Sequence, residues 1–511
     1  MLIFIPTKIY VYGGNVMKTI ARKTSIVAIL LVLALVFVTA CRNNEDDNET
    51  VPTANEGTSE TPPAGGTAPA NGTNDAPATP ASTVVIHEPQ DMGGRTVRIS
   101  SWWEGSQNFI GFGDEPDPGT AANYLTERLM WDNTRRVERE FNTSFEEVLI
   151  DFGYVLSTIT SSVMAGEPVS DIAFLGGSMT LSSAVSGTIL PLDEINLSSS
   201  DIFGAGIYGQ IRVNELGHVW VVGPNEPYPG GMGMGVNLNI INAIGAQNPV
   251  DLYNAGQWTW ENALEIMRLA TRDTTGDGII DQFGIAGQPG DFVAYIIGSN
   301  DGLLVTDDFQ YGFDHPNTIE AFEFAETIFR EGLWEYDRVH GFNVGDWGRN
   351  FWAAHDGNAA LFTASYWTTN YGDLPFEFAL VPWPTGPSNT SGNTFLAGWR
   401  QGFAFPASSD WAPADLLMVF EELTAWSGDD PGLLDESVLN MLRGRFLTEE
   451  DAQRQMNLVN TMGSCIGFVV PEYSWVLGDF VSYFLTQEQT VLQAIETHRG
   501  PRQEMLDNFF R

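Results

Sequence analysis

Residues 273–284 read DTTGDGIIDQFG, a pattern of carboxylates and glycines that could bind a hard cation. Calcium takes oxygen ligands at alternating positions of a loop whose sixth residue, here Gly278, permits a sharp turn. The twelfth position, where a bidentate Glu would close the shell, is Gly284, so Asp291 or Glu265 would have to complete it. The segment predicts either a structural calcium site or an Asx-turn loop without metal. The candidate ligands are Asp273, Thr275, Asp277, the carbonyl of Ile279, and Asp281.

Catalysis by paired carboxylates is the second chemistry that the sequence allows. The adjacent acids Glu146–Glu147 and Glu421–Glu422 could suggest a glycoside hydrolase, which needs two carboxylates across a cleft. Such pairs arise by chance among 65 acidic residues, and we expect most of them to be solvated helix faces. The six His lack metal-binding spacing, and no G-x-S-x-G or H-E-x-x-H motif occurs. We therefore expect no enzyme and keep a surface lipoprotein with glycoside hydrolase activity as the alternative.

The formal net charge is −41, and its distribution excludes several partners. Residues 1–41 contain four of the 24 Lys and Arg residues and no acid, so the remainder holds 20 basic and 65 acidic residues. Such a field repels nucleic acid and anionic lipid surfaces. No Lys follows Lys23, which excludes Walker A, Schiff-base and Ser-x-x-Lys chemistry. A dinucleotide site is also rejected, because GAGIYG at 204–209 precedes an alternating hairpin rather than a helix.

The N-terminal residues predict the compartment. From Met17 the chain reads MKTIARKTSIVAILLVLALVFVTAC, in which basic residues precede an apolar run. This pattern is typical of a signal peptide, and the run is short for a membrane span of about 20 residues. The VTAC that ends at Cys41 resembles the lipobox of bacterial lipoproteins, in which the Cys is acylated. We expect a signal peptide over 1–41, with the true start at Met17, and lipid anchoring through Cys41 on the extracytoplasmic face of the membrane.

The remainder divides into a tether and a folded body. Residues 42 to about 84 contain almost no hydrophobic side chains, and 42–90 are predicted to be a disordered, low-complexity tether. After them, strands and helices alternate, which favours a parallel α/β sheet with ligands at the loops beyond the strand ends, here 102–104 and 176–178. The predicted strands cover 95–101, 144–150 and 171–175, with a hairpin turning at 214–217. The predicted helices cover 121–140, a segment ending near 166, 259–272, 316–331, 412–426, 449–462, 474–485 and 487–498.

Several short motifs follow one another along the folded body. They include SGTILPLDE at 186–194, WTWEN at 258–262, and GNAALF at 357–362 followed by Trp367. Over about residues 92–505 this series resembles the extracellular solute-binding proteins of ABC sugar importers, the family of maltose-binding protein. Asn358 stands where that family usually has Lys, and Val236 where it usually has Tyr.

The resemblance implies the two-lobe α/β fold of type II periplasmic binding proteins, which close on their ligand by hinge motion. One lobe would take residues 91–200 plus 383–427, and the other 201–382 plus 428–511. The protein would capture an oligosaccharide or a sugar-like solute and deliver it to the transmembrane subunits of an ABC permease.

Sugar binding needs aromatic faces for the rings and planar polar groups for the hydroxyls. Fifteen Trp and fourteen Tyr supply ample material, although any one Trp could equally be a core residue. Asp171 is expected to be a structural cap at a strand end, and the calcium-like loop to stabilise a lobe. The predicted ligand contacts are Trp103, Glu104, Trp367, Trp399, Arg400 and Trp383.

Overall fold

The chain divides into two units, Met1–Pro77 and Ala78–Arg511, and every residue described below belongs to the second. The predicted signal peptide, Cys41 and the tether as far as residue 86 lie outside the described residues. Within the described part, no helix is long and apolar enough to span a bilayer. The computed structural model describes residues 87–102, 111–119, 124–192, 210–213, 218–222, 232–306, 308–335, 356–365, 374–394, 396–397, 401–428, 430–446, 448–459, 463–464, 477, 480–481, 483 and 489–510.

The first sheet has six strands in the order β2-β1-β3-β11-β5-β4. Its first three strands are parallel neighbours, whereas β11 runs antiparallel to β3 and β5. The hairpin β4–β5 forms at the predicted place, so the GAGIYG segment leads into a strand and not into the helix of a dinucleotide site. The strands are β1 Arg95–Ser101, β2 Thr143–Leu149, β3 Ile172–Gly176, β4 Gln210–Val213, β5 His218–Val222 and β11 Gln401–Ala404.

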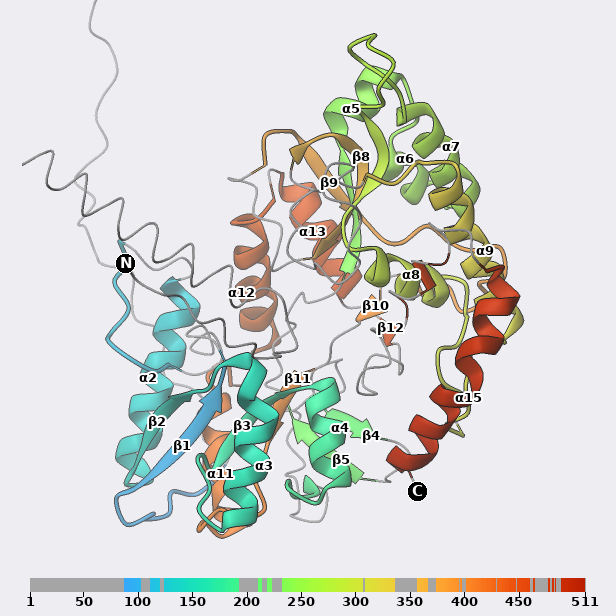
Figure 1. Ribbon diagram of the computed structural model, residues 1–511. Helices are drawn as coiled ribbons and strands as arrows, with labels where there is room; N and C mark the ends of the chain where they lie inside the picture. Colours follow the sequence, from blue (N-terminus) through green and yellow to red (C-terminus); the bar gives the residue numbers. More distant parts are fainter. Residues whose placement is uncertain are drawn as a thin grey trace, which may run out of the picture. The chain divides into compact units, whose positions relative to one another are not determined.

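Helices cover both faces of this sheet because its central strand is apolar throughout. Alternate residues of β3 enter two different clusters, Phe174 in one and Leu175 in the other, and all five residues of the strand are buried. The first cluster includes Val137 of α2 and Phe420 of α11, and the second includes Ile159 of α3. These helices are α2 Tyr124–Glu140, α3 Val155–Ala165, α4 Gly177–Val185 and α11 Pro413–Thr424 (Figure 1).

The second sheet has the order β12-β10-β6-β8-β7, with β9 also paired to β6. Adjacent residues of β8 again face opposite ways, since Leu361 joins the cluster of Phe292 whereas Phe362 joins that of Phe378. Phe446 also packs on the Phe362 side of the sheet, where its ring centroid lies 6.3 Å from that of Phe378. The strands are β6 Met232–Asn237, β7 Phe283–Ala286, β8 Ala359–Ser365, β9 Phe378–Val381, β10 Leu396–Ala397 and β12 Gly463–Ser464.

The helices associated with the second sheet begin with recognisable caps. Thr259 caps α7 as predicted, accepting a hydrogen bond from the Asn262 NH at 3.4 Å. Four of the described helices in this part, and α11, begin with Pro, whose missing NH is harmless in a first turn. The helices are α5 Leu238–Ile244, α6 Pro249–Asn254, α7 Trp260–Ala270, α8 Pro289–Gly298, α9 Pro316–Arg330, α12 Pro431–Arg443, α13 Glu449–Val459 and α15 Val491–Phe510.

The last helix is longer than its pattern predicts. We expected it to end at His498, before Gly500 and Pro501, but α15 continues through both to Phe510. Tertiary contacts explain this: Leu506 is fully buried, and the Gln503 side chain accepts a hydrogen bond from the Tyr311 NH at 2.8 Å. Figure 1 shows α15 beside α9, which it contacts. Packing therefore overrides the proline that a local pattern treats as a stop.

The chain passes between the two sheets three times. It leaves the first sheet at Val222 and enters the second at Met232, returns from Ala397 to Gln401, and passes again from α11 to β12. Sheet membership differs from the predicted lobes at two places. The hairpin β4–β5, expected in the second lobe, pairs with β11 in the first sheet, and β10, expected in the first lobe, pairs with β6 in the second.

Candidate functional site

The predicted ligand loops of the first sheet follow the carboxyl ends of β1 and β3, which are parallel neighbours. Trp102, directly after β1, is half-buried, and its ring centroid lies 5.0 Å from that of Phe174. At the end of β3 there is no loop: the strand ends at Gly176 and helix α4 begins at Gly177. Residues 176–178 therefore form a strand-to-helix junction, and the prediction of a ligand loop there is wrong.

Two of the predicted ligand groups have described neighbours at this same edge. Trp103 and Glu104 follow Trp102 in the chain but lie outside the described residues. Trp399 and Arg400 also lie outside them, and the residue that follows, Gln401, pairs with Gly176 at the end of β3. The described residues next to both groups therefore lie at one edge of the first sheet. Ligand binding by the side chains of Trp103, Glu104, Trp399 and Arg400 stays a prediction.

The second sheet gathers its flanking residues in a similar way. Trp367 lies outside the described residues, but it follows Ser365, the last residue of β8. Ser365 pairs with Met232, and Met232 also pairs with Leu396 of β10, just before the return to the first sheet. The chain segments that carry Trp367 and Trp399 therefore leave this sheet at the same edge.

Trp383 lies in the core, unlike the ligand contact that we predicted. Its side chain is fully buried, and its ring stacks on Tyr295 of α8 with centroids 5.1 Å apart and planes 6° from parallel. Phe292 of the same helix meets it edge-on at 6.0 Å. These contacts favour the alternative of core packing, because no face of the ring is left for a sugar.

Asp171 has the structural role expected of it. It is 2% exposed and accepts hydrogen bonds from the Arg98 backbone NH at 2.9 Å and from the Arg98 guanidinium at 3.1 and 3.2 Å. The Ser409 hydroxyl donates to Asp171 Oδ1 at 2.9 Å. The carboxylate therefore joins β1, the start of β3 and the segment after β11, as expected of a structural residue.

The calcium-like loop is held together by its own hydrogen bonds. The carboxylate of Asp273 accepts from the NH groups of Gly278 at 2.6 Å, Gly276 at 2.7 Å and Thr275 at 3.0 Å. These donors, Gly278 first, hold the pKa of Asp273 below its usual range. At the other end of the loop, Asp281 accepts from the NH and hydroxyl of Thr274 at 2.8 and 2.9 Å. The geometry is that of an Asx turn, which needs no metal to form.

A closing calcium ligand is missing from the twelfth position for a steric reason. Gly284 belongs to β7, and a Cβ added there would lie 2.5 Å from the Cβ of Met267. A carboxylate cannot replace this glycine without displacing α7. Among the described residues, no three acidic, His or Cys side chains converge as a metal site would require. Calcium binding by Asp273, Thr275, Asp277, Ile279 and Asp281 thus stays a prediction.

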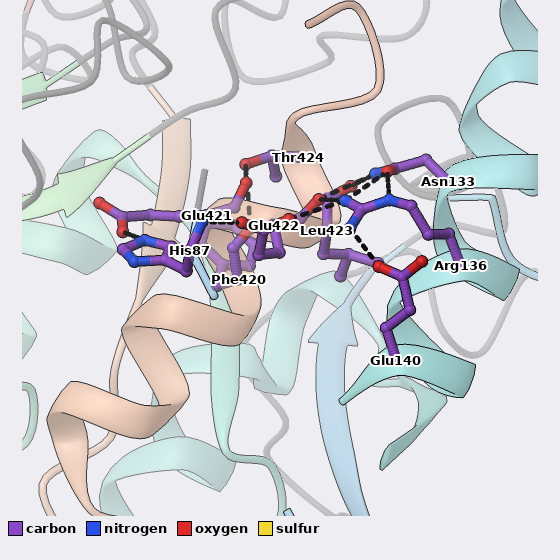
Figure 2. Close-up of polar contacts among 9 residues, drawn as sticks. All are labelled: His87, Asn133, Arg136, Glu140, Phe420, Glu421, Glu422, Leu423 and Thr424. Atoms are coloured by element: carbon purple, nitrogen blue, oxygen red, sulfur yellow. Dashed lines mark hydrogen bonds and ion pairs between the residues drawn. The ribbon is translucent and has the colours of Figure 1, made fainter. Parts of the chain in front are cut away.

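The acidic pair Glu421–Glu422 is buried, which corrects our expectation of a solvated helix face. Glu421 is 2% exposed and Glu422 is fully buried. The oxygens of Glu422 accept from the Arg136 guanidinium at 2.7 Å and from the His87 backbone NH at 2.5 Å, and the His87 ring lies 2.6 Å from Glu421 (Figure 2). Two carboxylates bound in this way cannot flank a substrate, so the pair gives the glycoside hydrolase alternative no support.

One further carboxyl, with a buried oxygen on a half-buried side chain, escaped the sequence analysis. Glu335 follows Trp334, which pairs with Ile285 of β7, and its Oε2 is buried with no hydrogen-bond partner among the described residues. Burial and, to a smaller extent, the charge of Asp356 raise the pKa of Glu335, a hydrogen bond with Asn358 opposes them, and the net result is a pKa of about 7. No motif marks this residue, because its environment is created by chain segments on either side of β7.

Comparison with known proteins rests on structure. No protein-family model matches this sequence, and a search of curated proteins finds no match. Among solved structures, the sugar-binding protein MalE from Xanthomonas citri superposes with a TM-score of 0.56 at 14% identity, over 81% of this chain and 98% of that one. UgpB from Mycobacterium tuberculosis, in complex with glycerophosphocholine, gives 0.54 at 13% identity, over 81% and 98%.

A third structure extends the range of bound molecules. An ABC substrate-binding protein from Listeria monocytogenes, in complex with cycloalternan, gives a TM-score of 0.53 at 13% identity, over 81% of this chain and 98% of that one. Similarity at such low identity concerns the fold, and it covers nearly all of each solved chain. Together with two sheets linked by three chain crossings, it shows that this protein has the two-lobe α/β fold of maltose-binding protein and related substrate-binding proteins of ABC importers.

Proposed function

We propose that this protein is the lipid-anchored substrate-binding subunit of an ABC importer and that it captures a carbohydrate without chemical change. The observation that carries the proposal is the triple passage of the chain between two sheets, which matches the linkage of lobes that hinge around a ligand. Ligand that contacts both lobes in the closed state alone stabilises that state through differential affinity.

One of the three crossings sets a limit on how far the two sheet edges can separate. Three residues, 398–400, join Ala397 of β10 to Gln401 of β11. An extended chain covers at most about 3.6 Å per residue, so the Cα atoms of Ala397 and Gln401 stay within about 14 Å of each other. The segment that carries the predicted ligand residues Trp399 and Arg400 therefore has to link both sheets in the open and closed forms.

The chemistry of the chain favours an uncharged, hydroxyl-rich ligand. With 65 acidic and 24 basic residues, the protein repels anions, whereas carboxylates accept hydrogen bonds from sugar hydroxyls. The named ligands of similar structures include cycloalternan and glycerophosphocholine, so both a neutral oligosaccharide and a zwitterionic headgroup belong in the test. We infer the neutral oligosaccharide, because the abundant Trp and Tyr suit sugar rings.

The remaining parts of the proposal concern location. A signal peptide cleaved before Cys41, acylation of that Cys and a tether over 42–90 would hold the folded body at the extracytoplasmic face of the membrane, beside the permease. Metabolic labelling of cells with a fatty-acid analogue tests this: the wild type should be labelled and membrane-bound, and Cys41→Ala should be neither. An unlabelled wild type would contradict the lipid anchor without affecting the binding function.

The binding function is tested by a panel of neutral oligosaccharides, with glycerophosphocholine and an anionic sugar as comparison ligands. A true ligand at 100 times its Kd should stabilise the folded protein by about 2.7 kcal/mol, raising the Tm, and should reduce the radius of gyration in solution scattering. Trp367→Ala should weaken binding, whereas replacement of the buried Trp383 should lower stability instead. If no ligand raises the Tm or changes the scattering, or if the sugar is hydrolysed, the proposal is wrong.

A further inference from the structure

The parallel strands of the first sheet end side by side, and the segment that follows β2 carries exposed aromatic rings at that edge. Ser101 at the end of β1 pairs with Leu149 at the end of β2, and the NH of Ile150 donates to the Ser101 carbonyl at 2.8 Å. β3 flanks β1 on its other side. In α/β sheets of this kind, ligands bind beyond the carboxyl ends of the strands.

Two large aromatic side chains in this segment face solvent. Phe152 is 44% exposed and Tyr154 is 66% exposed. Their backbone is fixed, because Asp151 Oδ1 accepts from the Gly153 NH at 3.0 Å and the Asp151 carbonyl accepts from the Tyr154 NH at 2.8 Å. The turn then leads directly into α3, which begins at Val155. The two rings are therefore held on a short, defined turn rather than on a long loop.

A row of aromatic rings connects Phe152 to the core. Ring centroids lie 4.8 Å apart between Phe403 and Phe174, 5.0 Å between Phe174 and Trp102, and 5.8 Å between Trp102 and Phe152. The exposed fraction rises along this row from 0% at Phe403 and 2% at Phe174 to 44% at Phe152. Support of this kind lowers the entropy lost when a ligand stacks on the exposed part of Phe152.

The neighbouring polar groups indicate what would stack there. Asp151 is exposed, and Glu147 of β2 accepts a hydrogen bond from the Ser101 hydroxyl at 3.3 Å at the same edge. Carboxylates accept hydrogen bonds and repel anions, so they suit a ligand that presents hydroxyl donors and no negative charge. A sugar ring combines such hydroxyls with an apolar face that can lie on an aromatic ring.

We propose that Phe152 and Tyr154 form an aromatic subsite for a sugar ring at the carboxyl edge of the first sheet, with Asp151 accepting hydrogen bonds from its hydroxyls. This subsite rests on the proposed carbohydrate-binding function and specifies it, since it adds a position for one sugar unit on the first lobe. Tyr154, the more exposed ring, contributes through its face, and Phe152 contributes as a partly exposed ring that packs on Trp102.

The test begins with a neutral oligosaccharide selected from the panel because it raises the Tm of the wild-type protein. Calorimetric titration with this sugar then gives the Kd of each variant, and circular dichroism checks folding. Tyr154→Ala and Phe152→Ala should each weaken binding by about three- to tenfold, the equivalent of losing one aromatic contact. Tyr154→Phe keeps the ring and should stay within about twofold of the wild type. The matched control is Met164→Ala, which removes a side chain that is 81% exposed at the opposite end of α3.

The outcomes separate the subsite from the function on which it rests. If the wild type binds a sugar and both alanine variants retain its Kd, the subsite is wrong and the proposed function stands. If the variants retain the Kd but lose uptake in cells, the aromatic rings contact a protein partner and the sugar subsite is again wrong. If no oligosaccharide binds the wild type, both proposals fail together. Should Phe152→Ala misfold, Tyr154→Ala still decides the matter, because Tyr154 is mostly exposed.

Discussion

Arg136 and Glu422 form a buried ion pair whose disruption we can quantify. The Arg136 guanidinium donates to Glu422 Oε2 at 2.7 Å, and the side chains are 6% and 0% exposed. Replacing Arg136 by Met keeps an unbranched chain of similar length but leaves the Glu422 carboxylate without its cation (Figure 2). Breaking a buried pair in this way destabilises proteins by about 3–5 kcal/mol.

The Glu422 carboxylate of this variant can become neutral only by taking up a proton. In water, protonating a glutamate costs about 1.4 kcal/mol for each pH unit above about 4.3, hence about 4 kcal/mol at pH 7 and about 1 kcal/mol at pH 5. The penalty for stranding the charge cannot exceed the cost of neutralising it. We therefore expect this effect to lower the free energy of unfolding of Arg136→Met by about 3–4 kcal/mol at pH 7 and by about 1 kcal/mol at pH 5.

A second loss comes from Asn133, whose Oδ1 accepts from the Arg136 Nε and terminal nitrogen at 3.2 and 2.9 Å. Losing these two donors costs about 1–3 kcal/mol. The double variant Arg136→Met/Glu422→Leu shares this loss but contains no stranded carboxylate. It should therefore be more stable than Arg136→Met at pH 7, and the difference between the two should shrink toward pH 5.

Urea unfolding followed by circular dichroism measures these free energies at both pH values. The matched control is Arg135→Met on the same helix, where a half-exposed pair with Glu138 at 2.6 Å should contribute about 1 kcal/mol or less. The reasoning is refuted if Arg136→Met costs less than about 1 kcal/mol at pH 7, or if its cost does not fall at pH 5.

Three further perturbations test other parts of the structure. Because burial raises the pKa of Glu335 from 4.5 to about 7, the folded protein retains a proton that the unfolded chain releases, so stability should fall by up to about 3 kcal/mol between pH 4.5 and pH 7. Glu335→Gln should remove this fall, and urea titrations that show the same pH slope for both proteins would contradict it. Gly235→Ala should destabilise by about 1–3 kcal/mol or more, since a Cβ would lie 2.2 Å from the Phe362 ring, whereas Gly500→Ala meets no atom within 4 Å and should be neutral or slightly stabilising. Asp273→Ala should lower the Tm by a few degrees even in EDTA, because three backbone NH groups lose their acceptor; a calcium-dependent rise in the wild-type Tm that Asp273→Ala abolishes would support the calcium site.

The local elements were predictable where short-range patterns determine them. β1 has the predicted bounds, the antiparallel strands β4 and β5 lie on either side of the predicted turn residues, and Thr259 caps its helix. Each depends on alternation, turn residues or a side chain near its own backbone, and each of these can be read within a few residues. The ordered series of motifs predicted the fold, and the solved structures confirm it.

Features that depend on distant partners could not be predicted in this way. The solvated face expected at Glu421–Glu422 is wrong because Arg136, nearly 290 residues earlier, neutralises Glu422 inside the protein. The hairpin β4–β5 joins the first sheet because β11, which follows much later in the chain, pairs with β5. The apolar sequence of α8 has no clear helical periodicity, because nearly all side chains in the middle of this helix are buried.

The candidate site shows the same limit in the choice among aromatic residues. Composition indicates that Trp and Tyr are available for a sugar, but Trp334, Trp383 and Trp426 are each almost fully buried, so residue type alone does not separate a stacking surface from a core. What separates them is the position at a strand end together with exposure, and by that criterion Phe152 and Tyr154 qualify although no motif marks them. A ring that binds ligand has to be supported from below and open above, and both conditions are set by tertiary structure. The resemblance to a family therefore predicted the fold, which the solved structures confirm, whereas the proposed ring contacts depend on how this chain packs.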